Sequence, residues 1–299
     1  MIDKINVKIG KKYPLDGILT LSENSENTPV VIFVHGSGQS DYDETIQSCK
    51  PFKDIALGLA EHGISSLRYN KRYYQYPDKV PVNFTIEDEV LDDVFSAIDW
   101  VKENNMFNKS SVYILGHSLG GMLAPYISKM NSNVSGIISL AGSPRNLEDI
   151  LLDQNKRSLN NLKDKTEQEK QEILNKEVVP FVNMVKNLKK DDSLIYLFGV
   201  PSSYWLSLNK INTAEIVKKL NIPMLFLHGE KDFQAYADVD FKMWKDILSD
   251  NKNVVFKLYN NLNHLFMESS GKTDLTEYIE ERHVDIAVIN DICQWIINS

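Results

Sequence analysis

A run of apolar residues in the middle of the chain is interrupted by the hexapeptide GHSLGG and then resumes with helical spacing. Residues 112–130 therefore predict a buried strand, an abrupt turn and a helix. Gly116 and Gly120 lack the side chains that would collide at such a turn. Ser118 would then be held with its hydroxyl directed out of the sheet. A glycine-rich turn with an idle serine is the alternative, but the position between a strand and a helix favours a nucleophile.

Strand-like runs alternate with helical segments along most of the chain. Strands are expected at residues 5–9, 18–21, 29–34, 64–69, 134–140, 222–228 and 254–259, and helices at residues 52–62, 86–101, 236–248 and 283–297. Thr85 and Asp88 resemble a capping box at the start of the second of these helices. The alternation predicts an α/β fold with a mostly parallel central sheet and helices on both faces.

Residues 146–211 break this alternation. They are rich in Lys, Asp, Asn, Gln and Leu, and only residues 194–198 suggest a strand. An insertion of this length is rarely structureless within a compact domain. We expect residues 1–145 and 212–299 to form the core domain and residues 146–211 to form a helical lid over the carboxyl edge of the sheet.

Two aromatic residues and one helical stretch of the insertion are candidates for contacts. Tyr204 and Trp205 either bind substrate at the pocket or pack the lid onto the core domain. The helical stretch at residues 167–188 is a candidate contact of a homodimer. The lysines and aspartates elsewhere in the insertion are typical of a solvated face.

The overall composition excludes several classes of protein. With a formal net charge of −8 and a pI near 5.3, the chain is unsuited to nucleic acid as its main partner. Its two cysteines, Cys49 and Cys293, are too few for a disulfide framework and lack metal-ligand spacing. No apolar run is long enough to span a membrane, and the first residues lack the apolar centre of a secretion signal. We expect a cytoplasmic protein.

A serine nucleophile needs a base and an orienting acid, which follow it along the chain in the order acid, then histidine. The strand expected at residues 222–228 leads into the sequence GEKD. A carboxylate just beyond the end of that strand would reach the edge where the serine lies. We expect Asp232 to be the acid, with Glu230, Asp238 and Asp240 as the alternatives.

His264 is the candidate base among the six histidines. It follows the strand expected at residues 254–259 and lies on a short polar loop, in the required order. The other histidines are expected to pack beside the serine (His117), to bond loop backbone (His35 and His228) or to lie on helix surfaces (His62 and His283).

Backbone amides would complete the site by binding the oxyanion that forms on the attacked carbonyl group. The Leu119 amide lies at the start of the helix after the serine, and the sequence HGSG after the strand at residues 29–34 brings glycine-rich backbone to the same edge. We expect Leu119 and Ser37 to be the two donors, with Gly38 or Gln39 as alternatives to Ser37. Each such donor typically stabilises the transition state by about 3 kcal/mol.

Four motifs together resemble the α/β-hydrolase superfamily. They are VIFVHGSGQSDYDET, GHSLGG, LFLHGEKD and LNHLF, and the similarity extends over essentially the whole chain. More narrowly, the chain resembles bacterial serine esterases of the dienelactone-hydrolase-like and cinnamoyl-esterase-like group. It departs from that pattern at Tyr42, where similar esterases carry Arg, and at Asn70, where they carry Asp.

The resemblance implies an α/β-hydrolase fold and hydrolysis of a small-molecule carboxylic ester through an acyl-enzyme, with no metal and no organic cofactor. Ser118 would attack, His264 would transfer the proton, and Asp232 would orient the imidazole. Thioesterase, amidase, peptidase or acyltransferase activity on the same triad is the alternative, because the first half-reaction is shared. A non-catalytic hydrolase-like binding protein is the alternative of another class.

Overall fold

The computed structural model describes residues 2–21, 28–104 and 106–299 of the chain. Its strands are β1 (Asp3–Ile9), β2 (Leu15–Leu21), β3 (Thr28–Val34), β4 (Ser65–Tyr69), β5 (Phe107–His117), β6 (Gly136–Leu140), β7 (Tyr196–Leu197), β8 (Val200–Pro201), β9 (Met224–Gly229) and β10 (Val254–Tyr259). Its α-helices are α1 (Pro51–Glu61), α2 (Arg72–Gln75), α3 (Asp92–Glu103), α4 (Leu119–Met130), α5 (Leu147–Asn161), α6 (Glu167–Ile173), α7 (Val179–Asn187), α8 (Ser202–Leu208), α9 (Thr213–Val217), α10 (Lys242–Ile247) and α11 (Ile286–Ile297).

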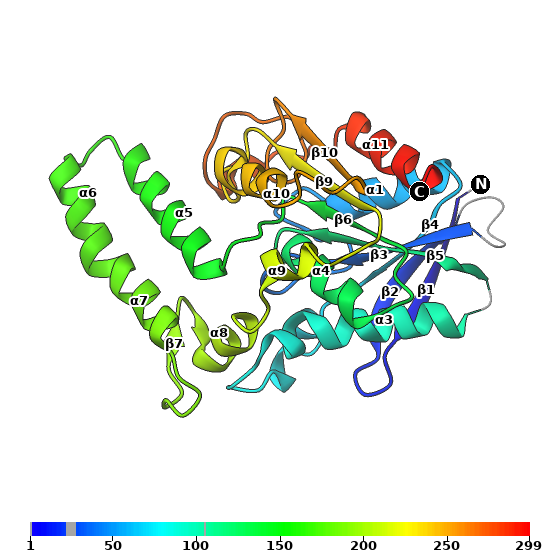
Figure 1. Cartoon of the computed structure of the whole chain (residues 1–299), viewed down its shortest axis with the longest axis horizontal. Coiled ribbons are helices and arrows are strands. Elements are labelled where there is room, and N and C mark those ends of the chain that lie inside the picture. Colours follow the sequence, from blue (N-terminus) through cyan, green and yellow to red (C-terminus); the bar gives the residue numbers. More distant parts are fainter. Residues whose placement is uncertain (1, 22–27, 105) are drawn as a thin grey trace.

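In the described part of the chain, eight of these strands form one twisted sheet in the order β1-β2-β4-β3-β5-β6-β9-β10 (Figure 1). The neighbours from β4 to β10 pair in parallel, whereas β2 pairs antiparallel with both β1 and β4. The expected α/β fold with a mostly parallel sheet is thus confirmed.

Both faces of the sheet are covered, as the unbroken apolar run in β3 predicts. Val30, Ile32 and Val34 face one hydrophobic cluster, which includes residues of α3, α4 and α10. Val31 and Phe33 face the other cluster, to which α1 and α11 contribute. Burying each of these side chains stabilises the fold by about 1.5–3 kcal/mol, so a strand covered on both sides is favoured at the centre of the sheet.

Because parallel strands end at the same edge, their following loops converge there. β3 leads into residues 35–40, β5 into Ser118, β9 into residues 230–236 and β10 into residues 260–264. The sheet therefore gathers at one edge the segments in which the catalytic candidates lie.

The long segment between β6 and β9 is mainly helical. Helices α5, α6 and α7, with a π-helical turn at Leu174–Val178, extend away from the sheet as two adjacent arms (Figure 1). A small cluster that includes Leu174, Val178 and Val182 holds the arms together. In contrast, α8 and α9 contribute to the large cluster beneath the sheet. Among the described residues, no helix is long and apolar enough to cross a membrane.

Several elements differ from the expected ones in their bounds. The helix expected at residues 86–101 starts with a π-helical turn at Glu87–Leu91, and the one expected at residues 236–248 starts with another at Ala237–Phe241. The strand suggested at residues 194–198 is the first half of a hairpin, β7–β8. β5 begins before the apolar run that predicts it. Its first residues, FNKSS, are mostly polar, so the pattern of apolar residues does not reveal them as strand. The Thr85 and Asp88 side chains do form the expected reciprocal cap.

Gly58 offers a test of how closely α1 packs against α11. A Cβ atom at this position would lie 2.3 Å from Cγ2 of the buried Ile289. We expect Gly58→Ala to lower the free energy of unfolding by about 1–3 kcal/mol, because the two helices must separate. Urea denaturation measures this change. In the Gly58→Ala/Ile289→Ala variant the added methyl group has room. The double variant should therefore lose less free energy of unfolding than the two single variants lose in sum, and strict additivity would contradict the steric conflict.

Candidate active site

The turn between β5 and α4 holds Ser118 in a rare backbone conformation. Its φ is 53° and its ψ is −114°, a region that costs a non-glycine residue about 1–3 kcal/mol. A Cβ atom on Gly116 would lie 2.1 Å from the Gly120 carbonyl oxygen, and one on Gly120 would lie 2.1 Å from that of Val34. The glycines thus permit a backbone approach that no other residue allows, and the serine stands between them at the sheet edge.

His264 and Asp232 meet at this edge, although 32 residues separate them. His264 Nδ1 lies 2.6 Å from Asp232 Oδ2, and both side chains are buried. A carboxylate only accepts, so Nδ1 carries the hydrogen and Nε2 of the neutral ring is free to act as a base. The Asp232 carboxylate also accepts the backbone N–H groups of Gln234 and Ala235, which fix its direction.

Ser118 and His264 line the same cavity, whose volume is about 260 Å³. Among the hydrogen bonds of the described residues, none joins the Ser118 side chain to the His264 side chain. Burial alone would raise the pKa of Asp232, but the neighbouring His264 and His228 and the two amides hold it below its usual value. Burial lowers the pKa of His264, and the opposing effect of Asp232 does not restore it. The imidazole is therefore neutral at neutral pH, as a general base must be.

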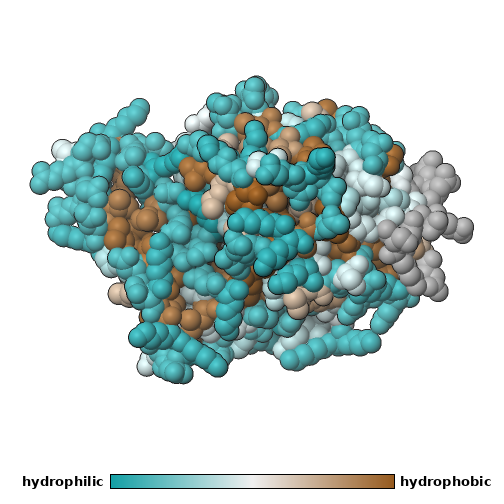
Figure 2. All heavy atoms as spheres, viewed as in Figure 1, coloured by the Kyte–Doolittle hydropathy of each residue, from teal (hydrophilic) through white to brown (hydrophobic). Residues whose placement is uncertain are grey.

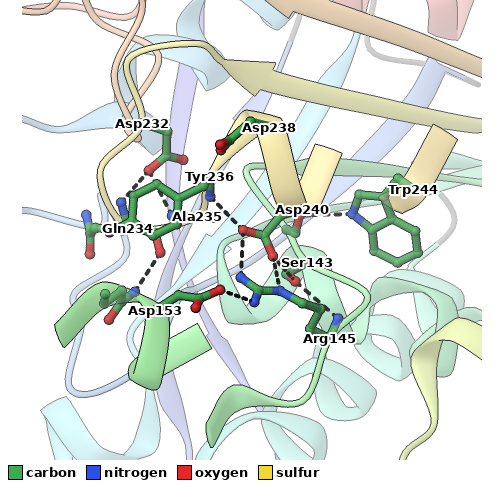
Figure 3. A network of polar contacts seen from close by, with 12 residues as sticks. Ser143, Arg145, Asp153, Asp232, Gln234, Ala235, Tyr236, Asp238, Asp240 and Trp244 are labelled. Atoms are coloured by element: carbon green, nitrogen blue, oxygen red, sulfur yellow. Dashed lines mark hydrogen bonds and ion pairs between the residues drawn. The ribbon is translucent and has the colours of Figure 1, made fainter. Parts of the chain in front are cut away.

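The alternative acids lie elsewhere. Asp238 pairs with Arg157 at the surface, and Glu230 is half-exposed beside Lys231. Asp240 is fully buried and accepts bonds from the Ser143 hydroxyl and the Arg145 guanidinium (Figure 3).

Asp240 ties the acid loop to the loop after β6. Its carboxylate accepts the Tyr236 N–H at 2.6 Å, four residues beyond Asp232. Arg145 bonds Asp240 on one side and Asp153 of α5 on the other, as Figure 3 shows. One partly exposed guanidinium thus joins the loops after β6 and β9 to the first helix of the long insertion. The sequence pattern does not reveal this network, because its members lie far apart along the chain.

The loop after β3 has its amides distributed between carboxylates and the cavity. The Gly36 N–H donates to Glu44 Oε1 and the Gly38 N–H donates to Glu89 Oε1, each at 2.7 Å. Gly38 is therefore committed elsewhere as a donor. Ser37 and Gln39, by contrast, line the cavity, as does Leu119 at the start of α4.

A buried lysine holds this loop from behind. Lys71 Nζ donates to the Gly36 carbonyl oxygen at 2.8 Å and to Glu89 Oε1 at 2.7 Å. Lys71 and Glu89 are both buried, so their charges depend on each other. Neither residue carries a motif that marks it in the sequence.

Most of the other histidines are bonded to backbone. His35 Nε2 lies 2.9 Å from the Asp41 carbonyl oxygen, and His228 Nε2 lies 2.9 Å from that of Ala235. His62, on the surface of α1, bonds a carbonyl of its own helix, and the exposed His283 faces Asp54. His117 is buried beside the serine, and its Nδ1 lies 3.0 Å from Glu44 Oε2.

Tyr204 and Trp205 lie in the hydrophobic core, outside the set of residues that line the cavity. The Trp205 Nε1–H donates to the Leu197 carbonyl oxygen, and the Tyr204 ring packs edge-on against Phe84. Burial and the nearby Glu89 raise the pKa of Tyr204. Of the two roles considered for these residues, their contacts are those of packing, because both rings lie in the core and Trp205 is bonded to β7.

The apolar wall of the cavity comes instead from α4 and α5. It includes Leu119, Met122, Leu147, Ile150 and Leu151. The opposite side is polar, with Gln39, Ser40 and Thr45. Among the described residues, no group of three or more His, Cys, Asp or Glu side chains is arranged to hold a metal ion.

Comparison with known proteins places this geometry in a family. Esterase EstD of Thermotoga maritima is 37% identical over 288 residues, which is 95% of this chain and 65% of that protein. The chain thus spans slightly less than two thirds of that relative. Est1E from Butyrivibrio proteoclasticus has a TM-score of 0.60 at 17% identity, with 98% of this chain and 99% of that chain covered. An esterase of Pyrococcus furiosus has a TM-score of 0.60 at 12% identity, with 100% and 91% covered.

At these low identities the two solved structures show a shared fold, which confirms the expected α/β-hydrolase architecture. The family model described as serine aminopeptidase, S33, matches residues 25–270, from the start of the parallel sheet to beyond His264. The chain therefore belongs to the serine aminopeptidase S33 family of α/β-hydrolases.

Proposed function

We propose that this chain is a serine hydrolase that cleaves carboxylic esters through an acyl-enzyme, with Ser118, His264 and Asp232 as its catalytic residues. The observation that carries the proposal is the 2.6 Å hydrogen bond between His264 and Asp232, beside a cavity that Ser118 also lines. The relative named as an esterase, 37% identical over 95% of this chain, supports an ester as the substrate.

In the proposed reaction, His264 Nε2 takes the hydroxyl proton as Ser118 Oγ attacks the ester carbonyl carbon. The Leu119 and Ser37 amides donate to the oxyanion of the tetrahedral intermediate. When the intermediate collapses, the bond to the alcohol breaks and Nε2 returns its proton to the departing oxygen. Water then attacks the acyl-enzyme with His264 again as the base, which releases the acid and restores Ser118.

The charges around the cavity favour an ester over the N-terminus of a peptide. An aminopeptidase must receive an α-ammonium group, for which an unpaired carboxylate is the natural partner. Among the described residues that line the cavity, Glu44 is the only acid, and it lies 3.0 Å from His117. A neutral ester needs no such partner.

The proposal includes residues 146–211 as a lid over the core domain of residues 1–145 and 212–299. Four residues of α5 line the cavity, including Leu147 and Gln154. Gln154 Nε2 also donates to the Gln234 carbonyl oxygen in the acid loop at 2.6 Å.

Figure 2 shows apolar surface among the polar residues over the two arms, where Phe181 and Met184 are partly exposed. The homodimer through residues 167–188 and the cytoplasmic location stay predictions from the sequence.

Replacing Ser118 tests the nucleophile. We expect Ser118→Ala to lower kcat for p-nitrophenyl acetate by about 10⁴-fold or more, because no other group can form the acyl-enzyme. The melting temperature should stay nearly unchanged, since alanine meets the same backbone strain as serine. Retention of wild-type turnover in the variant would place the nucleophile elsewhere.

The substrate class is tested on the wild-type protein with matched acetyl esters, acetyl thioesters and amino-acid anilides. We expect kcat/KM to be largest for the ester. A larger value for the anilide would favour a peptidase, and a larger value for the thioester would favour a thioesterase. A fluorophosphonate probe should label Ser118 in the folded protein, and its failure to do so would favour a binding protein.

The α5 wall predicts how acyl length affects turnover. We expect Ile150→Trp to fill the apolar side of the cavity, so that kcat/KM falls about tenfold more for p-nitrophenyl hexanoate than for the acetate. Lys156→Trp is the matched control, because it adds the same side chain to an exposed position of the same helix. Equal losses for both esters in Ile150→Trp would contradict the role of α5 in holding the acyl group.

A further inference from the structure

A buried pair of ionisable groups forms part of the wall of the candidate site. His117 Nδ1 is 3.0 Å from Glu44 Oε2, and both side chains are almost fully buried. Neither atom has a well-aligned hydrogen bond to any group in the described part of the chain. The other carboxylate oxygen, Oε1, accepts the Gly36 N–H at 2.7 Å.

The second nitrogen of His117 faces a further acceptor. Nε2 lies 3.0 Å from the backbone carbonyl oxygen of His264, and a carbonyl oxygen only accepts. Nε2 must therefore carry a hydrogen. Nδ1 faces a carboxylate oxygen, where a lone pair on nitrogen would be repelled, so one hydrogen must lie between the two atoms. The pKa of Glu44 is lowered and that of His117 is raised, which places this hydrogen on Nδ1. A ring with both nitrogens protonated is an imidazolium cation.

His35 provides a contrast within the same cluster of rings. It is buried to the same degree, but its Nε2 bonds the Asp41 carbonyl oxygen, and among the described residues no carboxylate forms an ion pair with its ring. Burial lowers the pKa of His35 to about 4, so this ring is neutral. Burial also acts against protonation of His117, yet the adjacent Glu44 and the carbonyl of His264 raise its pKa above the usual value. Glu44 raises the pKa of both rings, but only His117 lies within ion-pair distance of it, so the difference between the two histidines is direct contact with the carboxylate.

The cation lies close to the candidate base. The ring centroids of His117 and His264 are 4.7 Å apart. The ionisable groups that act on His264 are Asp232 and His228 from β9 and its loop, and His117 from β5. Those that act on His117 are Glu44 from the loop after β3, and Asp232. The neighbour of His117 from α1 is the apolar ring of Phe52.

We propose that Glu44 holds His117 as an imidazolium, and that this pair acts as a positioning element of the active site. Through Oε1 of Glu44 it fixes Gly36 next to the donor Ser37, and through Nε2 of His117 it fixes the backbone of His264. Its positive end faces the catalytic imidazole and opposes protonation there, so that His264 stays available as a base in mildly acidic solution. The last part rests on the proposed ester hydrolysis.

The protonation of His117 is tested without any substrate. We expect ¹⁵N spectra of the histidine-labelled wild-type protein to show hydrogens on both ring nitrogens of His117 between pH 6 and 8. Glu44→Gln should leave the ring neutral, because the amide oxygen still accepts the Gly36 N–H but carries no charge. A wild-type His117 with an unprotonated Nδ1 at pH 7 would overturn the proposal.

The effect on the base is tested by the pH dependence of kcat/KM for p-nitrophenyl acetate. Activity rises as His264 loses its proton, so a neighbouring cation moves this rise to lower pH. We expect Glu44→Gln and His117→Gln to move the acid limb to higher pH by about one unit, which means about tenfold lower kcat/KM below the limb. An unmoved limb in both variants would overturn the electrostatic role.

Asp43→Asn is the matched control. This buried carboxylate adjoins Glu44 in sequence but pairs with Arg68, away from His264. The variant should unfold at a lower urea concentration, and its acid limb should stay where it is in the wild type. A shift of the limb like that of Glu44→Gln would overturn the proposal, because the effect would then follow from destabilisation. Failure of the wild type to hydrolyse any ester would contradict the proposed function instead, and the spectra would still decide the charge of His117.

Discussion

The close approach of the first turn of α4 to the backbone of β3 and β5 is the constraint on which the candidate site depends. It exists because positions 116 and 120 carry no side chain. The approach forces Ser118 into a strained conformation, and bonds on both sides hold it there. The Ser118 N–H donates to the Leu140 carbonyl oxygen, and the Met122 N–H donates to that of Ser118. Backbone packing thus positions Ser118 at the sheet edge without any contribution from the candidate base or acid.

The sequence predicts the members of the candidate triad because each follows a recognisable strand. An apolar run marks the end of β5, β9 and β10, and parallel strands must deliver their next residues to one edge. Chain order then assigns the acid and the base without knowledge of distances. The same reasoning identifies the loop after β3 as the source of amides, but it cannot decide the donor. That choice depends on the carboxylates that occupy the Gly36 and Gly38 amides.

The groups that the sequence does not reveal are those paired over long stretches of chain. Lys71 and Glu89 lie 18 residues apart, and Arg145 and Asp240 lie 95 apart. A single charged residue carries no periodicity of its own, so nothing in the sequence distinguishes a buried one from a solvated one. The sequence does not predict the orientation of α8 either, for a similar reason. Its aromatic residues indicate a buried face, but the hairpin before the helix decides that this face meets the core.

These buried pairs share a geometry that gives them a common consequence. Glu44 with His117, Lys71 with Glu89, and Arg145 with Asp240 each join two segments that meet at the carboxyl edge of the sheet. Separating such a pair leaves a buried charge alone, at about 3–5 kcal/mol, whereas strain like that at Ser118 costs about 1–3 kcal/mol. A loop that moved to relieve the strain would therefore lose more than it gained. Loops held in this way keep the candidate catalytic groups in place more rigidly than loops of this length that only solvent and backbone bonds hold.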